Sequence, residues 1–249
     1  MNLRAAWLAL AAVGLAVSAS AQLNQPIYPA YDGFVANPDG SYTLSFRYFS
    51  HNAEPVTIAP GANNSFAPAA ADRGQPTTFK PGDWRFQCVM VVDKGFDGKL
   101  RWTLTYGGVT TGTSEHMLQS NWNLVEGAAE LRQIDYAKVP KGVCLNRAPQ
   151  VRILGAAGGG RGKPGTLAVT ASVGEQFSLF GSVNDEGLPR TAKLVTAWKQ
   201  VNGPGTATFE NAAAARTRAA FSAPGSYELE LSATDGELSA STRIVVSVK

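Results

Sequence analysis

The feature that most constrains the fold of this chain is the alternation of apolar and polar side chains over short segments. From residue 42 to residue 48, large apolar residues occupy every second position, and threonine, serine and arginine lie between them. A similar alternation returns over residues 86–92 and 100–106. Because successive side chains of a β-strand point to opposite faces, this period predicts strands of an antiparallel sheet system with one buried face.

The segments between these runs carry turn residues. Residues 37–40 read Asn-Pro-Asp-Gly, in which the proline fixes its own φ and Gly40 can accept a positive φ. Residues 59–71 are small, polar and proline-bearing, which is typical of a surface loop. Long amphipathic helical patterns are absent, and residues 125–139 leave two readings open, a short helix or an irregular strap. The sequence therefore predicts an all-β fold.

The first residues have the layout of a secretory signal peptide. Arg4 precedes an apolar run over residues 5–17, and small residues at positions 19–21 provide a cleavage site before Gln22. The run is shorter than the ~20 residues that a membrane-spanning helix needs. We expect residues 1–21 to be removed and the mature bacterial protein to be soluble, without a membrane span, in the periplasm or outside the cell.

Charge and cysteine content narrow the partners and the compartment. The formal net charge is +3, and the basic residues are scattered along the sequence, which argues against a nucleic-acid partner. The two cysteines, Cys88 and Cys144, would lie in an oxidising compartment, which favours a disulfide; two separate buried thiols are the alternative. A bridge would be worth about 4 kcal/mol in the chain-entropy model.

A boundary between two domains is expected near residue 146. Residues 146–149, Asn-Arg-Ala-Pro, form a short turn-forming linker, so we predict an N-terminal β-rich domain over residues 22–145 and a second domain over residues 146–249. In the second domain, strands recur every 8 to 12 residues, as in a β-sandwich. Trp198 occupies the third strand and Tyr227 begins an alternating run, and both are predicted to lie in the core. The predicted fold class is two immunoglobulin-like β-sandwiches in tandem.

Several motifs of the second domain carry a family resemblance. The segments NRAP, GSVNDEGLP, WKQVNGPGTATFEN, AAFSAPGSYELELSATDGELSAST and IVVSV occur in this order. Together they resemble a polycystic-kidney-disease (PKD) type module of the subgroup with a W-x-x-x-x-G-P-G turn. The resemblance implies a seven-strand sandwich that serves as an extracellular spacer or adhesion module and is not an enzyme. The glycine-rich residues 155–165 depart from the pattern. The first domain resembles an uncharacterised N-terminal region of exported proteobacterial proteins, which implies no activity.

The residues that could support catalysis do not form a recognisable constellation. Residues 160–165 fit a dinucleotide-binding glycine motif in letters, but a proline and a strand-like segment follow where a helix is required. The two histidines, His51 and His116, lie in no zinc-binding spacing or nucleophile elbow. Asp185 and Glu186 are adjacent, and adjacent side chains of a strand diverge. We therefore expect a non-enzymatic protein without an organic cofactor.

A calcium site is the one cofactor that the sequence suggests. Asn146 precedes the first strand of the second domain, Asp185 follows its second strand, and Asp235 lies in the turn before its last strand. In a sandwich these segments can meet at one end, where their oxygens would suit calcium. The alternative is that they are ordinary turn residues, because Asp-Gly is a common turn dipeptide.

Four aromatic residues of the first domain are candidates for ligand binding. They lie near predicted turns outside the clean alternation: Tyr28, Tyr31, Phe34 and Trp122. Exposed aromatic faces can stack on sugar rings or anchor a protein. The alternative is that they pack at the ends of the sandwich or against the neighbouring domain.

Together these patterns predict a non-catalytic protein of the bacterial cell envelope. Its expected role is binding, adhesion or spacing, with a protein or carbohydrate partner. A structural or accessory subunit of an envelope assembly, pairing through an edge strand, is the alternative. A glycan-active enzyme ranks third, since no catalytic constellation is visible in the sequence.

Overall fold

The computed structural model describes residues 24–124, 129–154 and 165–249, with the side chains of residues 130 and 165–170 left out. The predicted signal peptide and most of the glycine-rich segment lie outside these residues. The described chain is almost entirely β, as predicted, and its only described α-helix is the four-residue α1 (Ala129–Arg132). No helix in the described part of the chain has the length and hydropathy needed to cross a membrane.

The first sandwich is built from two three-stranded sheets and a two-stranded ribbon. One sheet has the order β1-β2-β6, and the other has the order β4-β7-β8. The strands are β1 (Ile27–Ala36), β2 (Tyr42–Ser50), β3 (Val56–Thr57), β4 (Asn64–Ala67), β5 (Thr78–Phe79), β6 (Gly82–Val92), β7 (Arg101–Tyr106) and β8 (Val109–Gly112). All pairs are antiparallel.

The core of the first sandwich lies between these sheets. Leu44, Phe46 and Tyr48 of β2 point inward and meet Trp102 and Leu104 of β7, as the alternation predicts. The expectation that the outer face is open is wrong for part of the sheet. A second apolar cluster on that face includes Val35, Val89 and Leu131. The segment that contains α1 therefore covers the outer face of the β1-β2-β6 sheet at this end, and both faces of the sheet are buried there.

The second sandwich has two four-stranded sheets. Their orders are β10-β16-β15-β12 and β13-β14-β11-β9. The strands are β9 (Gln150–Ile153), β10 (Gly165–Ala171), β11 (Phe177–Asn184), β12 (Val195–Asn202), β13 (Ala207–Phe209), β14 (Arg216–Phe221), β15 (Gly225–Thr234) and β16 (Ser239–Val248). β10 pairs with β16 in parallel, whereas the other pairs are antiparallel.

Two side chains mark this second sandwich as immunoglobulin-like. Trp198 of β12 is buried in the core cluster, and its indole nitrogen donates to the carbonyl oxygen of Ala215 at 3.0 Å. Tyr227 of β15 is also buried, and its hydroxyl donates to the carbonyl oxygen of Ala223 at 2.9 Å. A tyrosine bonded back to the chain just before its own strand is the tyrosine corner of such sandwiches.

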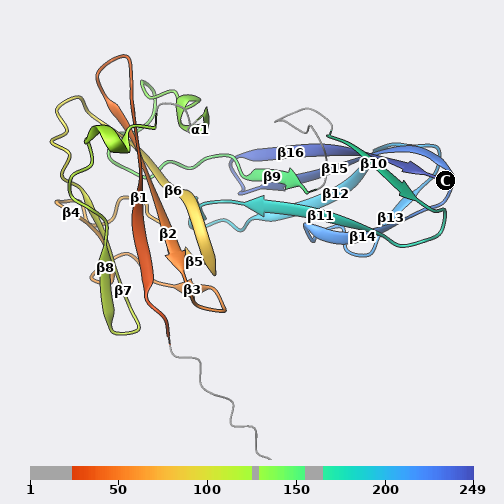
Figure 1. Cartoon of the computed structure of the whole chain (residues 1–249), viewed down its shortest axis with the longest axis horizontal. Helices are drawn as coiled ribbons and strands as arrows, with labels where there is room; N and C mark the ends of the chain where they lie inside the picture. Colours follow the sequence, from red (N-terminus) through yellow and green to blue (C-terminus); the bar gives the residue numbers. More distant parts are fainter. Residues whose placement is uncertain (1–23, 125–128, 155–164) are drawn as a thin grey trace, which may run out of the picture.

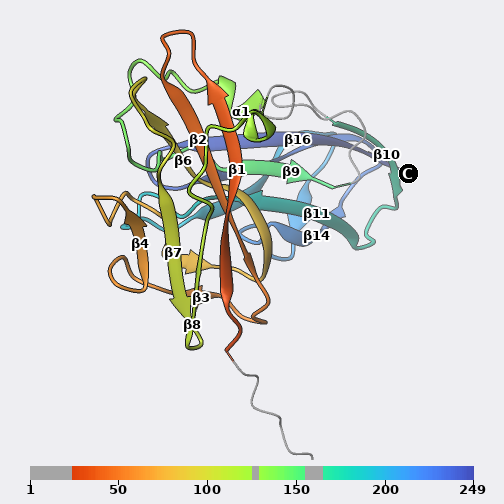
Figure 2. The same cartoon turned by 60° about the vertical axis from the view of Figure 1, so that its left-hand side comes forward.

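The two sandwiches are arranged end to side. In Figure 1 the strands of the first sandwich run across the long axis of the molecule, and those of the second run along it, with the C-terminus at the far tip. The helix α1 lies beside β1 and β6 in both Figure 1 and Figure 2. The connections at residues 144–149 and 185–194 therefore lie where the two sandwiches meet.

Candidate functional site

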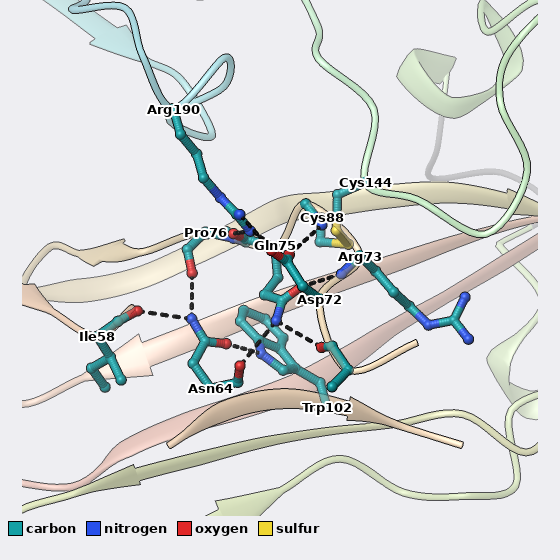
Figure 3. A network of polar contacts seen from close by, with 12 residues as sticks. Ile58, Asn64, Asp72, Arg73, Gln75, Pro76, Cys88, Trp102, Cys144 and Arg190 are labelled. Carbon is teal, nitrogen blue, oxygen red and sulfur yellow. Dashed lines mark hydrogen bonds and ion pairs between the residues drawn. A yellow bond between two sulfur atoms is a disulfide. The ribbon is translucent and has the colours of Figure 1, made fainter. Parts of the chain in front are cut away.

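The connection between β11 and β12, residues 185–194, joins the second sandwich to the first. Leu188 is buried in the core cluster of the first sandwich. The Arg190 guanidinium donates to both carboxylate oxygens of Asp72, at 2.9 and 2.8 Å, and to the carbonyl oxygen of Gln75 at 2.8 Å (Figure 3). A bidentate arginine–carboxylate pair fixes orientation as well as distance. We call this contact the Arg190 latch.

A buried polar network holds the first-sandwich side of the latch. The Gln75 amide nitrogen donates to the carbonyl oxygens of Asn64 and Ala71, at 3.0 and 3.1 Å. Asn64 donates to the carbonyl oxygens of Ile58 and Pro76, at 3.0 and 2.8 Å, and accepts from the Trp102 indole at 2.9 Å. Figure 3 shows this network directly beneath the latch. The loop that carries Asp72 is therefore anchored to the core rather than free on the surface.

The predicted disulfide between Cys88 and Cys144 is confirmed, and it lies beside this network. The Cys144 backbone N–H donates to the carbonyl oxygen of Arg73 at 2.6 Å, and the Leu145 N–H donates to that of Val89 at 2.8 Å. The disulfide thus ties the segment that follows α1 to strand β6. Because Asn146 follows directly, the start of the linker is fixed to the first sandwich.

Arg147 extends this attachment to the second sandwich. Its guanidinium donates to the carbonyl oxygen of Phe86 in β6 and, at 3.4 Å, to the Glu186 carboxylate. Its backbone N–H also donates to Glu186, at 2.6 Å. Burial raises the pKa of Glu186 to about 7, and the charge of Arg147 opposes that rise. This single arginine therefore contacts β6 of one sandwich and the β11–β12 connection of the other.

The three residues of the predicted calcium site lie next to these contacts. Asp185 and Asp235 are 8% and 2% exposed. One carboxylate oxygen of Asp185 accepts from the Gly187 N–H at 2.8 Å, and one of Asp235 accepts from the backbone of residues 237 and 238 at 2.7 and 2.6 Å. The Asn146 amide nitrogen donates to Glu237 at 3.1 Å. In each of the three side chains, the remaining oxygen is buried without a hydrogen-bond partner among the described residues.

The two carboxylates influence one another electrostatically. Burial raises the pKa of Asp185, and the negative charge of Asp235 raises it further. Lys80 of the first sandwich acts on Asp185 in the opposite direction. An unpaired buried carboxylate oxygen is costly in free energy, and a hard cation would remove that cost. The unpartnered oxygens of Asp185 and Asp235 are therefore candidate ligands of a cation.

The chemistry of this donor set fits calcium rather than a transition metal. Within residues 24–124, 129–154 and 165–249, no group of three or more histidine, cysteine, aspartate or glutamate side chains is placed to hold a metal ion. The candidate set instead combines two carboxylates with the Asn146 amide oxygen, and the side-chain oxygen of Asn184, next to Asp185 in sequence, is also buried without a partner in the described chain. Mixed carboxylate, amide and water ligands are usual for calcium.

The structure corrects the prediction for two of the four aromatic residues. Tyr31 and Phe34 lie inside β1, are only 4% and 6% exposed and belong to the core. Trp122 is half-buried, with its ring centroid 5.5 Å from that of Tyr31. Tyr28 is 44% exposed and packs its edge against His51. The four do not form one surface, because the inward-facing rings fill the space between the sheets.

Neither histidine belongs to the contacts between the two sandwiches described above. The ring of His51 packs against those of Tyr28 and Phe49, and His116 is exposed in a turn. A shallow hollow of about 370 Å³ lies elsewhere, along residues 57–63 beside Thr105 and Tyr106. Neither histidine lines this hollow.

Comparisons with known proteins give no family for the chain. No family model matches it. Among solved structures, the titin fragment A168169 is 11% identical and covers 89% of this chain and 98% of its own, with a TM-score of 0.30. Drosophila N-cadherin EC1-3 is 11% identical over 86% of this chain and 78% of its own, with a TM-score of 0.28. The N-terminal four immunoglobulin domains of Dscam1 are 11% identical over 90% of this chain and 54% of their own, with a TM-score of 0.28. Scores this low add nothing to the fold described above.

Proposed function

We propose that this chain is an exported, non-catalytic binding and spacer protein of the bacterial cell envelope, whose two sandwiches are held in fixed orientation by a calcium-stabilised joint. The observation that carries the proposal is that Asn146, Asp185 and Asp235, on the linker and two turns of the second sandwich, each keep a buried side-chain oxygen without a hydrogen-bond partner among the described residues. The N-terminal signal-like segment and the Cys88–Cys144 disulfide support export to an oxidising compartment.

The joint would work through the segments that carry the ligands. Asn146 belongs to the linker that the disulfide fixes to the first sandwich, and Asp185 opens the connection that carries Leu188 and Arg190. A cation bound by Asn146, Asp185 and Asp235 would neutralise the buried carboxylates and tie the linker to two turns of the second sandwich. Binding would therefore stiffen both routes between the sandwiches, which is the property that a spacer requires.

We also propose that residues 146–249 form a domain of the PKD type, with the boundary at residue 145. The Gly-Pro-Gly turn after Trp198 supports this assignment in physical terms. A Cβ at Gly203 would lie 2.4 Å from the Tyr227 ring, and one at Gly225 would lie 2.7 Å from Pro204. The motif thus packs the turn against the tyrosine corner, where only glycine leaves enough room.

The alternative role, a subunit that assembles through an edge strand, has less support. Phe34 of β1 forms a parallel bridge with Asn123, and Val91 of β6 forms one with Lys141. Both edges of the β1-β2-β6 sheet are therefore partly covered by the chain itself, which opposes edge-to-edge pairing there.

Calorimetry of the protein expressed from Gln22 tests the joint. Calcium should bind with measurable heat and raise Tm, because it binds only the folded state. Asp235→Asn should abolish both effects. Asp97→Asn is the matched control, since Asp97 also precedes a glycine but is exposed and bonds only locally in the described chain. If wild-type protein gives neither heat nor a Tm shift at millimolar calcium, the calcium joint is refuted.

A further inference from the structure

The outer face of the β13-β14-β11-β9 sheet gathers three arginines around an exposed phenylalanine. In the strand register, Phe180 of β11 lies opposite Arg216, Ser178 opposite Arg218, and Ser182 opposite Arg152. Residues directly opposite in an antiparallel pair share a face. We call the surface formed by Arg152, Ser178, Phe180, Ser182, Arg216 and Arg218 the arginine face. Scattered in the sequence, these cations are brought together by the fold.

The orientation of β11 fixes which side chains belong to this face. Leu179 is buried in the core cluster, and a Cβ at Gly181 would lie 2.5 Å from a Leu231 methyl, so the odd-numbered residues point inward. Phe180 points outward and is 52% exposed. The three arginines are exposed as well. A single exposed ring is common on protein surfaces, so the significance of Phe180 comes from the three arginines that surround it.

The charges of the arginine face are unpaired, in contrast to those of the opposite sheet. There Glu230 forms ion pairs with Lys199 and Arg243, both at 2.7 Å. None of the three arginines forms an ion pair with a described carboxylate. Glu210 adjoins this ladder, because its N–H donates to the carbonyl oxygen of Arg218, but its side chain makes no ion pair within the described residues. The guanidiniums are therefore free to bind an external anion.

The chemistry of the face suits carboxylates that are carried on sugar rings. A guanidinium binds a carboxylate through two parallel hydrogen bonds, and a phenyl ring offers an apolar face for the C–H side of a sugar ring. The serines between them can exchange hydrogen bonds with sugar hydroxyls. Strand spacings place Arg216 and Arg218 about 7 Å apart and put Arg152 about 10 Å across the sheet. A flat face of this extent fits an extended chain rather than a compact ligand.

We propose that the arginine face binds an acidic polysaccharide, a polymer of sugars that carry carboxylates. This inference rests on the proposed binding function and supplies its ligand class, at a surface separate from the joint. Membrane surfaces and nucleic acids also attract cations, but a membrane needs a broader apolar area, and duplex binding depends on many phosphate contacts.

Binding of polygalacturonate oligosaccharides to the protein expressed from Gln22 tests the proposal. The titration is carried out in low salt with a calcium chelator, so that it does not depend on the calcium joint. A lack of polygalacturonate binding would therefore leave the calcium result standing. A lack of calcium binding would likewise leave the polygalacturonate result standing. The neutral comparison is a galactan of similar length. We expect binding to the acidic oligosaccharide at least tenfold tighter than to the neutral one.

Variants identify the surface. R216Q/R218Q should weaken binding by tenfold or more, and Phe180→Ala should weaken it severalfold without a change in charge. K94Q/K99Q, which removes the same charge from an exposed turn of the first sandwich, should leave binding unchanged. The proposal is overturned if both double variants weaken binding equally, if Phe180→Ala has no effect, or if duplex DNA or anionic vesicles bind more tightly through the same arginines. Formation of a Phe180-dependent dimer would also overturn it.

Discussion

At the residue scale, Asp32 is the side chain that most clearly holds an irregular backbone in place. Its buried carboxylate accepts hydrogen bonds from Arg85 at 2.8 Å, from the Phe86 N–H at 2.9 Å and from Ser45 at 3.2 Å. Phe86 has a φ of 58°, which is unfavourable for a residue with a bulky side chain. The same residue offers its carbonyl oxygen to Arg147. Asp32 therefore stabilises the part of β6 on which the inter-sandwich contact depends.

The first prediction concerns this carboxylate. Asp32→Asn preserves the shape but removes the charge that accepts from Arg85 and from the Phe86 N–H. We expect a loss of about 1–3 kcal/mol in the free energy of unfolding, measured by urea denaturation. Asp83→Asn should cost far less, because Asp83 is half-exposed and, among the described residues, forms an ion pair only with Arg47. Equal losses in the two variants would contradict the assigned role.

At the scale of elements, the Gly-Pro-Gly turn shows how a short motif fixes a strand end. Gly203 has a φ of 155°, and a Cβ there would collide with the Tyr227 ring. Gly203→Ala should lower the free energy of unfolding by roughly 2 kcal/mol or more, because strain adds to the clash. Gly108→Ala is the control, since its positive φ costs energy but nothing lies within 4 Å of the new methyl. Urea denaturation followed by far-ultraviolet circular dichroism would measure the loss in both variants.

Some strands are easier to recognise in the sequence than others. Strands β2 and β15 follow a clean period of two, and the structure places them as predicted. The sequence does not reveal strand β1, because Tyr31 and Phe34 are three residues apart and yet face the same way. The register shift between Tyr31 and Gly33 explains this spacing, since a bulge inserts one residue and reverses the alternation. A local pattern cannot reveal a bulge that is stabilised by Asp32 and a distant strand.

The residues of the candidate site also differ in how readily the sequence reveals them. Asn146, Asp185 and Asp235 could be singled out because each is a turn residue at one end of a sandwich. Asp72 and Arg190 could not, because 118 residues separate them in sequence and neither belongs to a recognisable motif. The covering of the β1-β2-β6 sheet by Leu131 was missed for the same reason. Contacts between distant loops depend on the packed fold rather than on local periodicity.

At the scale of the whole molecule, the Arg190 latch is one of the contacts that join the two sandwiches. Asp72 is half-exposed, so solvent screens the pair and its contribution to stability is small. Arg190→Ala should therefore change unfolding only slightly but broaden the distribution of distances between the sandwiches in small-angle scattering. Arg101→Ala removes an exposed arginine paired with Glu115 inside the first sandwich and should leave the distribution unchanged. An unchanged profile for Arg190→Ala would exclude the latch as an orienting contact.

The same contact should respond to acid. The hydrogen bonds from Arg190 lower the pKa of Asp72 below its usual value. The stabilisation is therefore complete above the ordinary carboxyl pKa of about 4, and it is lost as the pH falls through the lower folded-state value. Glu186, whose pKa is about 7, titrates between neutral pH and about pH 5 and can alter the scattering profile there. Loss of the latch should broaden the profile only in strong acid. In Arg190→Ala this acid-dependent broadening should be absent.

The parallel pairing of β10 with β16 gives the second sandwich a mechanical property. A pull applied along β16, away from the first sandwich, would act along its ladder with β10 rather than across it. The bonds of such a ladder share the load and must break together, whereas a ladder pulled open from one end loses them one at a time. The β10-β16 ladder would therefore resist extension of the second sandwich when the molecule is under tension along its long axis.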